Sequence, residues 1–321
     1  MAARPRITII GTGFVGTALG LALQRLRPSS NFEIVGHDKS APAAAAAKKR
    51  GAIDRSDWNL ISAVDEADLI FIATPVQAVR ETMMHIGPHL KAGAIVTDTA
   101  GTKSEVMRWA KELLPQSVNF IGGDPMLGRE GAPAEGATAE VFNKSYYCLA
   151  PAVNADADAI RILADFVTGL GAQPYFVDPD EHDGIAAAAS HLPFLLSLAL
   201  MNTAAHSSSW TEIQKVAGEN FKTSSAPVNT DPLRWSSLTT TNSAALARWI
   251  DNTIAELQSL KSVIAAGDLE AIEKTLDQAR DAHLRMLRAG QSDETPLQEV
   301  GKDRLRQMFF GNLGGRRESK K

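Results

Sequence analysis

Short apolar runs alternate with helix-periodic segments along the first half of the chain. The apolar runs are rich in β-branched residues and predict buried strands at residues 7–10, 32–37, 68–74, 94–97, 119–121, 146–149 and 173–177. The segments between them predict one helix that begins at Thr17 and four more at residues 41–50, 77–89, 105–114 and 156–170. This alternation predicts an α/β fold, a Rossmann-type doubly wound and mostly parallel sheet covered on both faces.

The pattern changes after Asp178, where strands stop and apolar residues recur with a period near 3.6. Helices are predicted at residues 181–205, 210–217, 231–266 and 269–288, the last with Asp268 as its N-cap. We therefore expect a dinucleotide-binding domain at residues 1–178, an all-α dimerisation and substrate domain at 179–290, and a C-terminal tail at 291–321. The alanine- and leucine-rich helical half predicts a homodimer, because such surfaces often pair across a two-fold axis.

Composition and charge exclude several classes of partner. The 321 residues carry a net charge of −4, which gives no reason to expect binding to nucleic acid or to an anionic membrane. A single cysteine, Cys148, cannot form an intrachain disulfide, and no secretory signal is visible, so a cytoplasmic location is expected. The apolar stretch 184–205 is interrupted by His191, Pro193 and Asn202, and it predicts a buried helix instead of a membrane span. No cluster has the spacing of metal ligands.

Three glycines with G-x-G-x-x-G spacing follow the first strand: Gly11, Gly13 and Gly16. The first allows a tight strand-to-helix turn, the second leaves room for a pyrophosphate, and the third lets the helix pack closely on the strand. The phosphates would lie at the start of the helix, where free N–H groups favour anions. Phe14 and Val15, inside the motif, are also expected to contact the cofactor.

Two further strand ends complete the expected nucleotide site. Asp38 follows the second strand, 22 residues after Gly16, and a carboxylate there would bind the ribose hydroxyls and repel a 2′-phosphate. NAD is therefore the favoured cofactor, and the neighbouring Lys39 leaves NADP open. Thr74 and Pro75 end the next strand, where the proline breaks regular pairing at the edge on which a cofactor lies in open α/β sheets.

Several motifs together resemble the prephenate/arogenate dehydrogenase family of tyrosine biosynthesis, over about residues 6–288. They are GTGFVGTALG, ATPV at 73–76, D-x-x-x-x-K at 98–103, GGDPMLGRE at 122–130, EHDGIAAAASHLPFLL at 181–196, and DP-x-x-W at 231–235 followed by Asn242. The resemblance implies a dimer whose active site lies between a nucleotide-binding domain and a helical domain. It also implies oxidative decarboxylation, in which the ring carbon that carries the 4-hydroxyl loses hydride to NAD, the hydroxyl loses its proton, and carbon dioxide leaves.

Three positions depart from the substrate site that the resemblance implies. Asp124 stands where the family has a catalytic histidine, Gly101 where it has a serine, and Ala226 where it has a carboxylate-binding arginine. A carboxylate can still accept a proton, although it is a weaker base than imidazole. We therefore expect Asp124 and His191 to be the catalytic residues. The candidate cations for substrate carboxylates are Lys103, Arg129 and Lys222.

Structural roles compete with these functional ones. Asp124 can form a turn in a glycine-rich loop, His191 can be a core residue, and His182 and Asp183 are expected to cap and anchor the start of their helix. Three functions stay open. They are the oxidation of prephenate or arogenate with NAD or NADP, a related dehydrogenation of a 4-amino-substituted cyclohexadienyl acid, and nucleotide binding by a pseudoenzyme.

Overall fold

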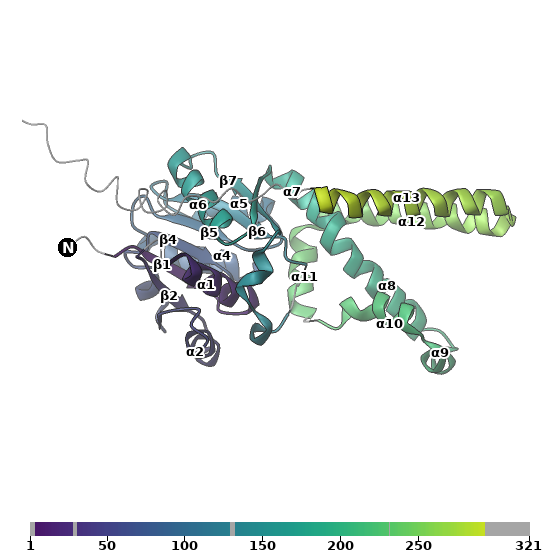
Figure 1. Cartoon of the computed structure of the whole chain (residues 1–321), viewed down its shortest axis with the longest axis horizontal. Helices are drawn as coiled ribbons and strands as arrows, with labels where there is room; N and C mark the ends of the chain where they lie inside the picture. The colour runs from purple at the N-terminus through teal and green to yellow at the C-terminus, as the bar shows by residue number, and fades with distance from the viewer. Residues whose placement is uncertain (1–3, 28–30, 129–131, 231, 293–321) are drawn as a thin grey trace, which may run out of the picture.

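An eight-stranded sheet forms the body of the molecule (Figure 1), in a computed structural model that describes residues 4–27, 31–128, 132–230 and 232–292. The strands are β1 (Arg6–Ile10), β2 (Glu33–His37), β3 (Arg55–Ser56), β4 (Leu69–Ile72), β5 (Ile95–Asp98), β6 (Asn119–Pro125), β7 (Tyr146–Pro151) and β8 (Gln173–Phe176). Their order is β3-β2-β1-β4-β5-β6-β7-β8, with every pair parallel except β6 and β7. The strand order reverses between β1 and β4, the point where open α/β sheets bind ligands.

Helices cover both faces of this sheet. One core contains α1 (Phe14–Leu26) and α6 (Ala157–Gly169), and the other contains α4 (Val76–Ile86) and α5 (Ser104–Leu113). Alternate residues of β4 enter the two cores, as the two-residue period of a strand requires. The shorter elements are α2 (Ala41–Lys49), α3 (Leu60–Val64), η2 (Gly87–His89), η3 (Ala134–Gly136) and η4 (Ala139–Phe142). The predicted doubly wound, mostly parallel α/β fold is confirmed.

The sheet differs from the sequence prediction in two places. The two-residue strand β3 and the five-residue helix α3 were not predicted, because elements so short carry little periodic signal. Strand β6 continues through residues predicted to form a glycine-rich loop, and residues 122–124 pair with residues 148–150 of antiparallel β7. Glycine is required at Gly123, since a Cβ there would lie 2.6 Å from the Asp98 carbonyl oxygen. Asp124 is therefore fixed on a strand and does not form a turn.

After β8, all secondary structure of the described residues is helical, and it extends away from the sheet (Figure 1). The elements are α7 (Pro179–Ala186), the π-helical turn η5 (Ala187–His191), α8 (Leu192–Ala205), α9 (Trp210–Val216), α10 (Glu219–Ser225), η6 (Ala226–Val228), α11 (Pro232–Thr241), α12 (Ser243–Ala266) and α13 (Leu269–Ser292). In Figure 1, α8 to α10 form one arm and the α12–α13 hairpin forms another.

Two predicted helices are interrupted. The helix predicted at 231–266 divides at Asn242, and α10 was not predicted. The helix predicted at 181–205 contains the π turn η5, because Pro193 has no N–H with which to close a regular turn onto Ala189. Asp268 caps α13 as predicted, and its Oδ1 accepts a hydrogen bond of 3.0 Å from the Ala271 N–H. Residues 293–321 of the predicted tail lie outside the described residues.

The apolar helical run is only partly buried in a single chain. By length and composition alone, the run Pro179–Ala205 could cross a membrane, and 28% of its most apolar window is buried in the fold. Leu196, Leu198 and Leu200 of α8 are exposed, as are Ile254 and Leu257 of α12. The prediction of a buried helix is therefore wrong for one chain alone. Apolar faces of this extent are typical of interaction surfaces.

Candidate active site

The three motif glycines form the turn between β1 and α1. Gly11 has a φ of +93°, and a Cβ on it would lie 2.5 Å from the Ala73 carbonyl oxygen at the end of β4. A Cβ on Gly16 would lie 1.9 Å from the Gly11 carbonyl oxygen. At Gly13 no atom lies within 4 Å of the Cβ position. Side chains are thus excluded at the first and last glycine, and the backbone of the middle one is open to a ligand.

Asp38 lies beside this turn, directly after β2. Its Oδ2 accepts hydrogen bonds from the backbone N–H (2.7 Å) and the hydroxyl (3.0 Å) of Thr12. Its Oδ1 accepts one bond from the Ser40 N–H (2.8 Å) and keeps a second lone pair for a ribose hydroxyl. The carboxylate is therefore held at the rim of the glycine turn, while Lys39 is exposed next to it.

A cleft lies between the glycine turn and the ends of β4 and β5. Its lining includes the predicted cofactor residues Gly13, Phe14, Val15, Thr74 and Pro75, and also Thr99, Gly101, Arg234 and Leu238. Helix α1 begins without a side-chain cap, so its first N–H groups are left for another acceptor. Within the described part of the chain, the buried hydroxyl of Thr74 has no hydrogen-bond partner. These groups fit the phosphates and hydroxyls of a nucleotide cofactor.

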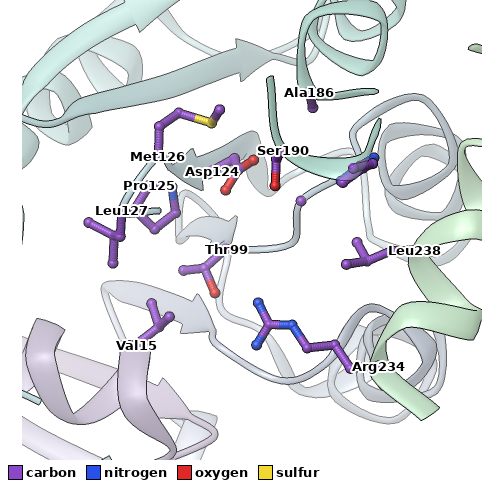
Figure 2. Close-up of a pocket in the computed structure, with 12 residues that line it drawn as sticks. Val15, Thr99, Asp124, Pro125, Met126, Leu127, Ala186, Ser190, Arg234 and Leu238 are labelled. Atoms are coloured by element: carbon purple, nitrogen blue, oxygen red, sulfur yellow. The ribbon is translucent and has the colours of Figure 1, made fainter. Parts of the chain in front are cut away.

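A second pocket adjoins this cleft (Figure 2). It is lined by Val15, Thr99, Gly101, Asp124, Pro125, Met126, Leu127, Ala186, Ser190, His191, Arg234 and Leu238. Five of these residues also line the cofactor cleft: Val15, Thr99, Gly101, Arg234 and Leu238. The pocket is therefore continuous with the cleft, and it is built jointly by the carboxyl end of the sheet and by the helical region.

A buried histidine holds Asp124 from behind the pocket. His182 Nε2 donates to Asp124 Oδ2 over 3.2 Å, and His182 Nδ1 donates to Asp183 Oδ1 over 3.0 Å. Burial of the ring lowers the pKa of His182, but the hydrogen bonds to the two carboxylates outweigh burial and raise this pKa to about 11. His182 is therefore an imidazolium at neutral pH, with both N–H groups bound to carboxylates.

Asp183 connects this histidine to the start of α5. Its two oxygens accept hydrogen bonds from the backbone N–H groups of Lys103 (2.6 Å) and Ser104 (3.0 Å). Burial raises the pKa of the Asp183 carboxyl, but the bonds from His182 and from these N–H groups prevail and lower it. Asp178 caps α7 instead. The prediction that His182 and Asp183 cap their own helix is wrong, because both side chains point inward onto the sheet elements.

His191 faces the same part of the pocket as Asp124. A Cβ on Gly101 would lie 3.6 Å from His191 Nε2 and 4.0 Å from Asp124 Oδ2. The Asn242 amide nitrogen donates to the Asp183 carbonyl oxygen over 2.8 Å and lies 3.4 Å from His191 Nδ1. Because an amide nitrogen only donates, His191 Nδ1 accepts, which assigns the ring proton to Nε2. A donor and an acceptor thus both lie within 4.0 Å of one point beside Gly101.

Of the predicted substrate cations, the two that the structure describes do not line this pocket. Lys103 is fully buried, and its ammonium pairs with the equally buried Asp98 behind the pocket wall. Lys222 is exposed on α10 and lines neither the pocket nor the cofactor cleft. Arg129 lies outside the described residues. The Lys103 ammonium therefore does not reach the pocket, and its ion pair with Asp98 links the end of β5 to the start of α5.

Three residues at the site were not assigned to it from the sequence. Arg234 lines the pocket, Asn242 orients His191, and His182 binds Asp124. All three fall within motifs noted above, since Arg234 occupies a variable position of DP-x-x-W and His182 belongs to the EHD block. The motifs marked the segments, but the partner of each side chain depends on how the helices pack.

Comparisons with known proteins agree with this architecture. The family "Prephenate dehydrogenase, nucleotide-binding domain" matches residues 19–176, and "Prephenate dehydrogenase, dimerization domain" matches residues 178–278. The prephenate dehydrogenase of Lactococcus lactis subsp. cremoris (strain MG1363) is 30% identical over 287 residues, which are 87% of this chain and 78% of that protein.

Two solved structures share the fold. The crystal structure of Synechocystis arogenate dehydrogenase superposes with a TM-score of 0.74 at 26% identity, over 88% of this chain and 99% of that one. The structure of prephenate dehydrogenase from A. aeolicus, in complex with hydroxyphenyl propionate and NAD+, superposes with a TM-score of 0.82 at 22% identity, with the same coverage. With its two-part match and its relative at 30% identity, this chain belongs to the prephenate/arogenate dehydrogenase family of oxidoreductases.

Proposed function

We propose that the chain catalyses the NAD-dependent oxidative decarboxylation of prephenate or arogenate. The observation that carries this proposal is the position of Asp124 and His191, whose Oδ2 and Nε2 both lie within 4.0 Å of one point beside Gly101. That point lies in a pocket continuous with the cleft between the glycine turn and the ends of β4 and β5. A substrate carbon held there would lie next to bound cofactor.

The two side chains suit a hydroxyl group. A hydroxyl donates one hydrogen bond and accepts others, so it can donate to the Asp124 carboxylate and accept from His191 Nε2–H. Bound NAD would take hydride from the carbon that carries this hydroxyl. Asp124 would accept the hydroxyl proton as hydride leaves, and would return it to the phenolate oxygen that forms when carbon dioxide departs. His182, as an imidazolium, donates a hydrogen bond to the Asp124 carboxylate and would hold it in one orientation between turnovers.

The preference for NAD follows from Asp38. Its carboxylate is fixed by Thr12 and Ser40 at the rim of the glycine turn, where the 2′-phosphate of NADP would meet a negative charge. Lys39 is exposed and does not pair with Asp38, so any use of NADP would depend on its reorientation toward that phosphate.

We also propose a homodimer built on the helical region, acting in the cytoplasm. The exposed apolar side chains of α8 and α12 supply a surface that a second copy would cover. The region that carries them matches the family's dimerization domain.

Formation of the reduced cofactor tests the proposed reaction: NADH when NAD is supplied and NADPH when NADP is supplied, each measured with prephenate and, separately, with arogenate. Turnover of either acid with NAD supports it. If neither acid turns over while NAD raises the melting temperature of the protein, the chain binds the cofactor for another purpose and the proposal is wrong.

A second candidate substrate is a cyclohexadienyl acid with an amino group at C4. The carboxylate of Asp124 favours it, because a cationic amine would form a charge-assisted hydrogen bond there. His191 Nε2–H counts against the protonated amine, since an ammonium group accepts no hydrogen bond. Turnover of the 4-amino analogue of prephenate but not of prephenate would establish this alternative.

A further inference from the structure

Arg234 lies where the cofactor cleft meets the pocket that contains Asp124. It projects from the first turn of α11 and lines both cavities. Figure 2 shows its guanidinium reaching into the pocket toward Thr99, while the Asp124 carboxylate enters from strand β6 at another wall. The pocket therefore has an anionic wall and a cationic wall.

Arg234 is the one lysine or arginine in the lining of this pocket, among residues that the structure describes. Lys103 is committed to Asp98, and Lys222 is exposed on α10. A guanidinium stays charged at all relevant pH values and binds a carboxylate through two parallel hydrogen bonds. An acid that enters this pocket thus meets Arg234 as its cationic partner.

The placement of the two opposite charges on different walls of one pocket suits a cyclohexadienyl acid. In prephenate and arogenate, the C4 hydroxyl and the C1 substituents lie at opposite ends of one six-membered ring. A ring that binds with C4 beside Asp124 and His191 and with C1 toward Arg234 would place each end next to a group that suits it. We propose that Arg234 binds the side-chain carboxylate of the substrate and so sets the direction of the ring. This inference rests on the proposed function and adds to it the residue that recognises the acid.

The chemistry distinguishes the two carboxylates at C1. The ring carboxylate leaves as carbon dioxide and loses its charge in the transition state. A guanidinium bound to it would stabilise the substrate more than the transition state, which would slow the reaction. The side-chain carboxylate keeps its charge throughout, so its ion pair with Arg234 holds the ring without opposing decarboxylation. The same carboxylate is present in 4-hydroxyphenylpyruvate, the product from prephenate.

The test measures binding of 4-hydroxyphenylpyruvate to the full-length protein saturated with NAD, for wild type, Arg234→Met and Arg234→Lys. We expect the methionine variant to lose roughly 10- to 100-fold in affinity, in keeping with loss of a charged hydrogen-bonded partner. The lysine variant should lie between, because an ammonium does not bind bidentately. 4-Methylphenol, which has no carboxylate, should compete equally well in all three proteins, and the affinity for NAD should not change.

The matched control is Arg161→Met, at an exposed arginine of α6 that pairs with Asp158 and lines neither cavity. It should bind every ligand as wild type does.

Two outcomes would overturn the inference. One is an unchanged affinity for 4-hydroxyphenylpyruvate in Arg234→Met. The other is a loss of affinity confined to prephenate, which would place Arg234 on the ring carboxylate. A loss of NAD affinity would place it on the cofactor. If wild type turns over neither prephenate nor arogenate, the proposed function itself fails, and if it turns over arogenate alone, the same comparison is made with tyrosine, the product from arogenate. If the methionine variant does not fold, the lysine variant carries the same comparison.

Discussion

His182 Nε2 donates a hydrogen bond to Asp124 Oδ2 over 3.2 Å, and this bond joins helix α7 to strand β6. The two residues are 58 positions apart in the sequence and are 2% and 8% exposed. The other ring N–H of His182 binds Asp183, so one imidazolium lies between two carboxylates. The site therefore places a buried imidazolium beside the carboxylate that lines the pocket.

Asp124→Asn should lower kcat for the proposed substrate by about 10²- to 10⁴-fold, the usual contribution of a general base. The amide keeps the shape of the side chain but cannot accept the hydroxyl proton. Asp124→His, which restores a basic group, should be clearly more active than the asparagine variant. Steady-state NADH formation gives both values. Wild-type kcat in Asp124→Asn would show that another group takes the proton, and Asp158→Asn, at an exposed site on α6, is the matched control.

His182→Gln should destabilise the protein in a pH-dependent way. The folded-state pKa of His182 is about 11, above the value of 6.5 expected when unfolded. Its stabilisation is therefore complete below pH 6.5, declines as the pH rises, and is lost above about 11. The difference in free energy of unfolding between wild type and variant should be larger at pH 6 than at pH 9.5, as urea denaturation measures. A difference that is equal at the two pH values would argue against a charged His182.

Lys103→Met should reduce stability instead of substrate affinity. The change leaves the fully buried Asp98 without its cation, which typically costs about 3–5 kcal/mol. Urea denaturation gives the loss, and the double variant Asp98→Asn/Lys103→Met should recover part of it, because no buried charge is then unpaired. A raised KM at unchanged stability would instead restore Lys103 as a direct substrate ligand.

Asp38→Ala should weaken NAD binding by roughly 10-fold or more, because a charged acceptor of ribose hydrogen bonds is lost. The variant should also narrow the preference for NAD over NADP, since the negative charge that repels a 2′-phosphate is removed. Titration of each dinucleotide measures both effects. Lys39→Met is the control: it should leave NAD affinity unchanged and lower any affinity for NADP. An unchanged NAD affinity in Asp38→Ala would place the ribose elsewhere.

Local sequence rules predicted the nucleotide half well. Each step there depends on a few consecutive residues, because β1, the glycine turn and α1 are contiguous from Arg6 to Leu26. Gly11 and Gly16 are required by steric contacts within that unit and with the adjoining strand end. Asp38 follows at the end of the next strand, where parallel pairing of β1 and β2 necessarily brings it beside the turn.

The substrate half was determined only by the tertiary structure. The sequence marked Asp124, His191 and Lys103 as residues able to carry charge or protons, but periodicity does not specify which groups meet. Packing of α7 against β6 and α5 paired Asp124 with His182 and bound Asp183 to the backbone N–H groups of Lys103 and Ser104. Packing of α11 over the pocket brought in Arg234. Such contacts join residues dozens of positions apart. They form because burial of the apolar faces of these elements also removes nearby polar groups from water, and these polar groups then bind one another.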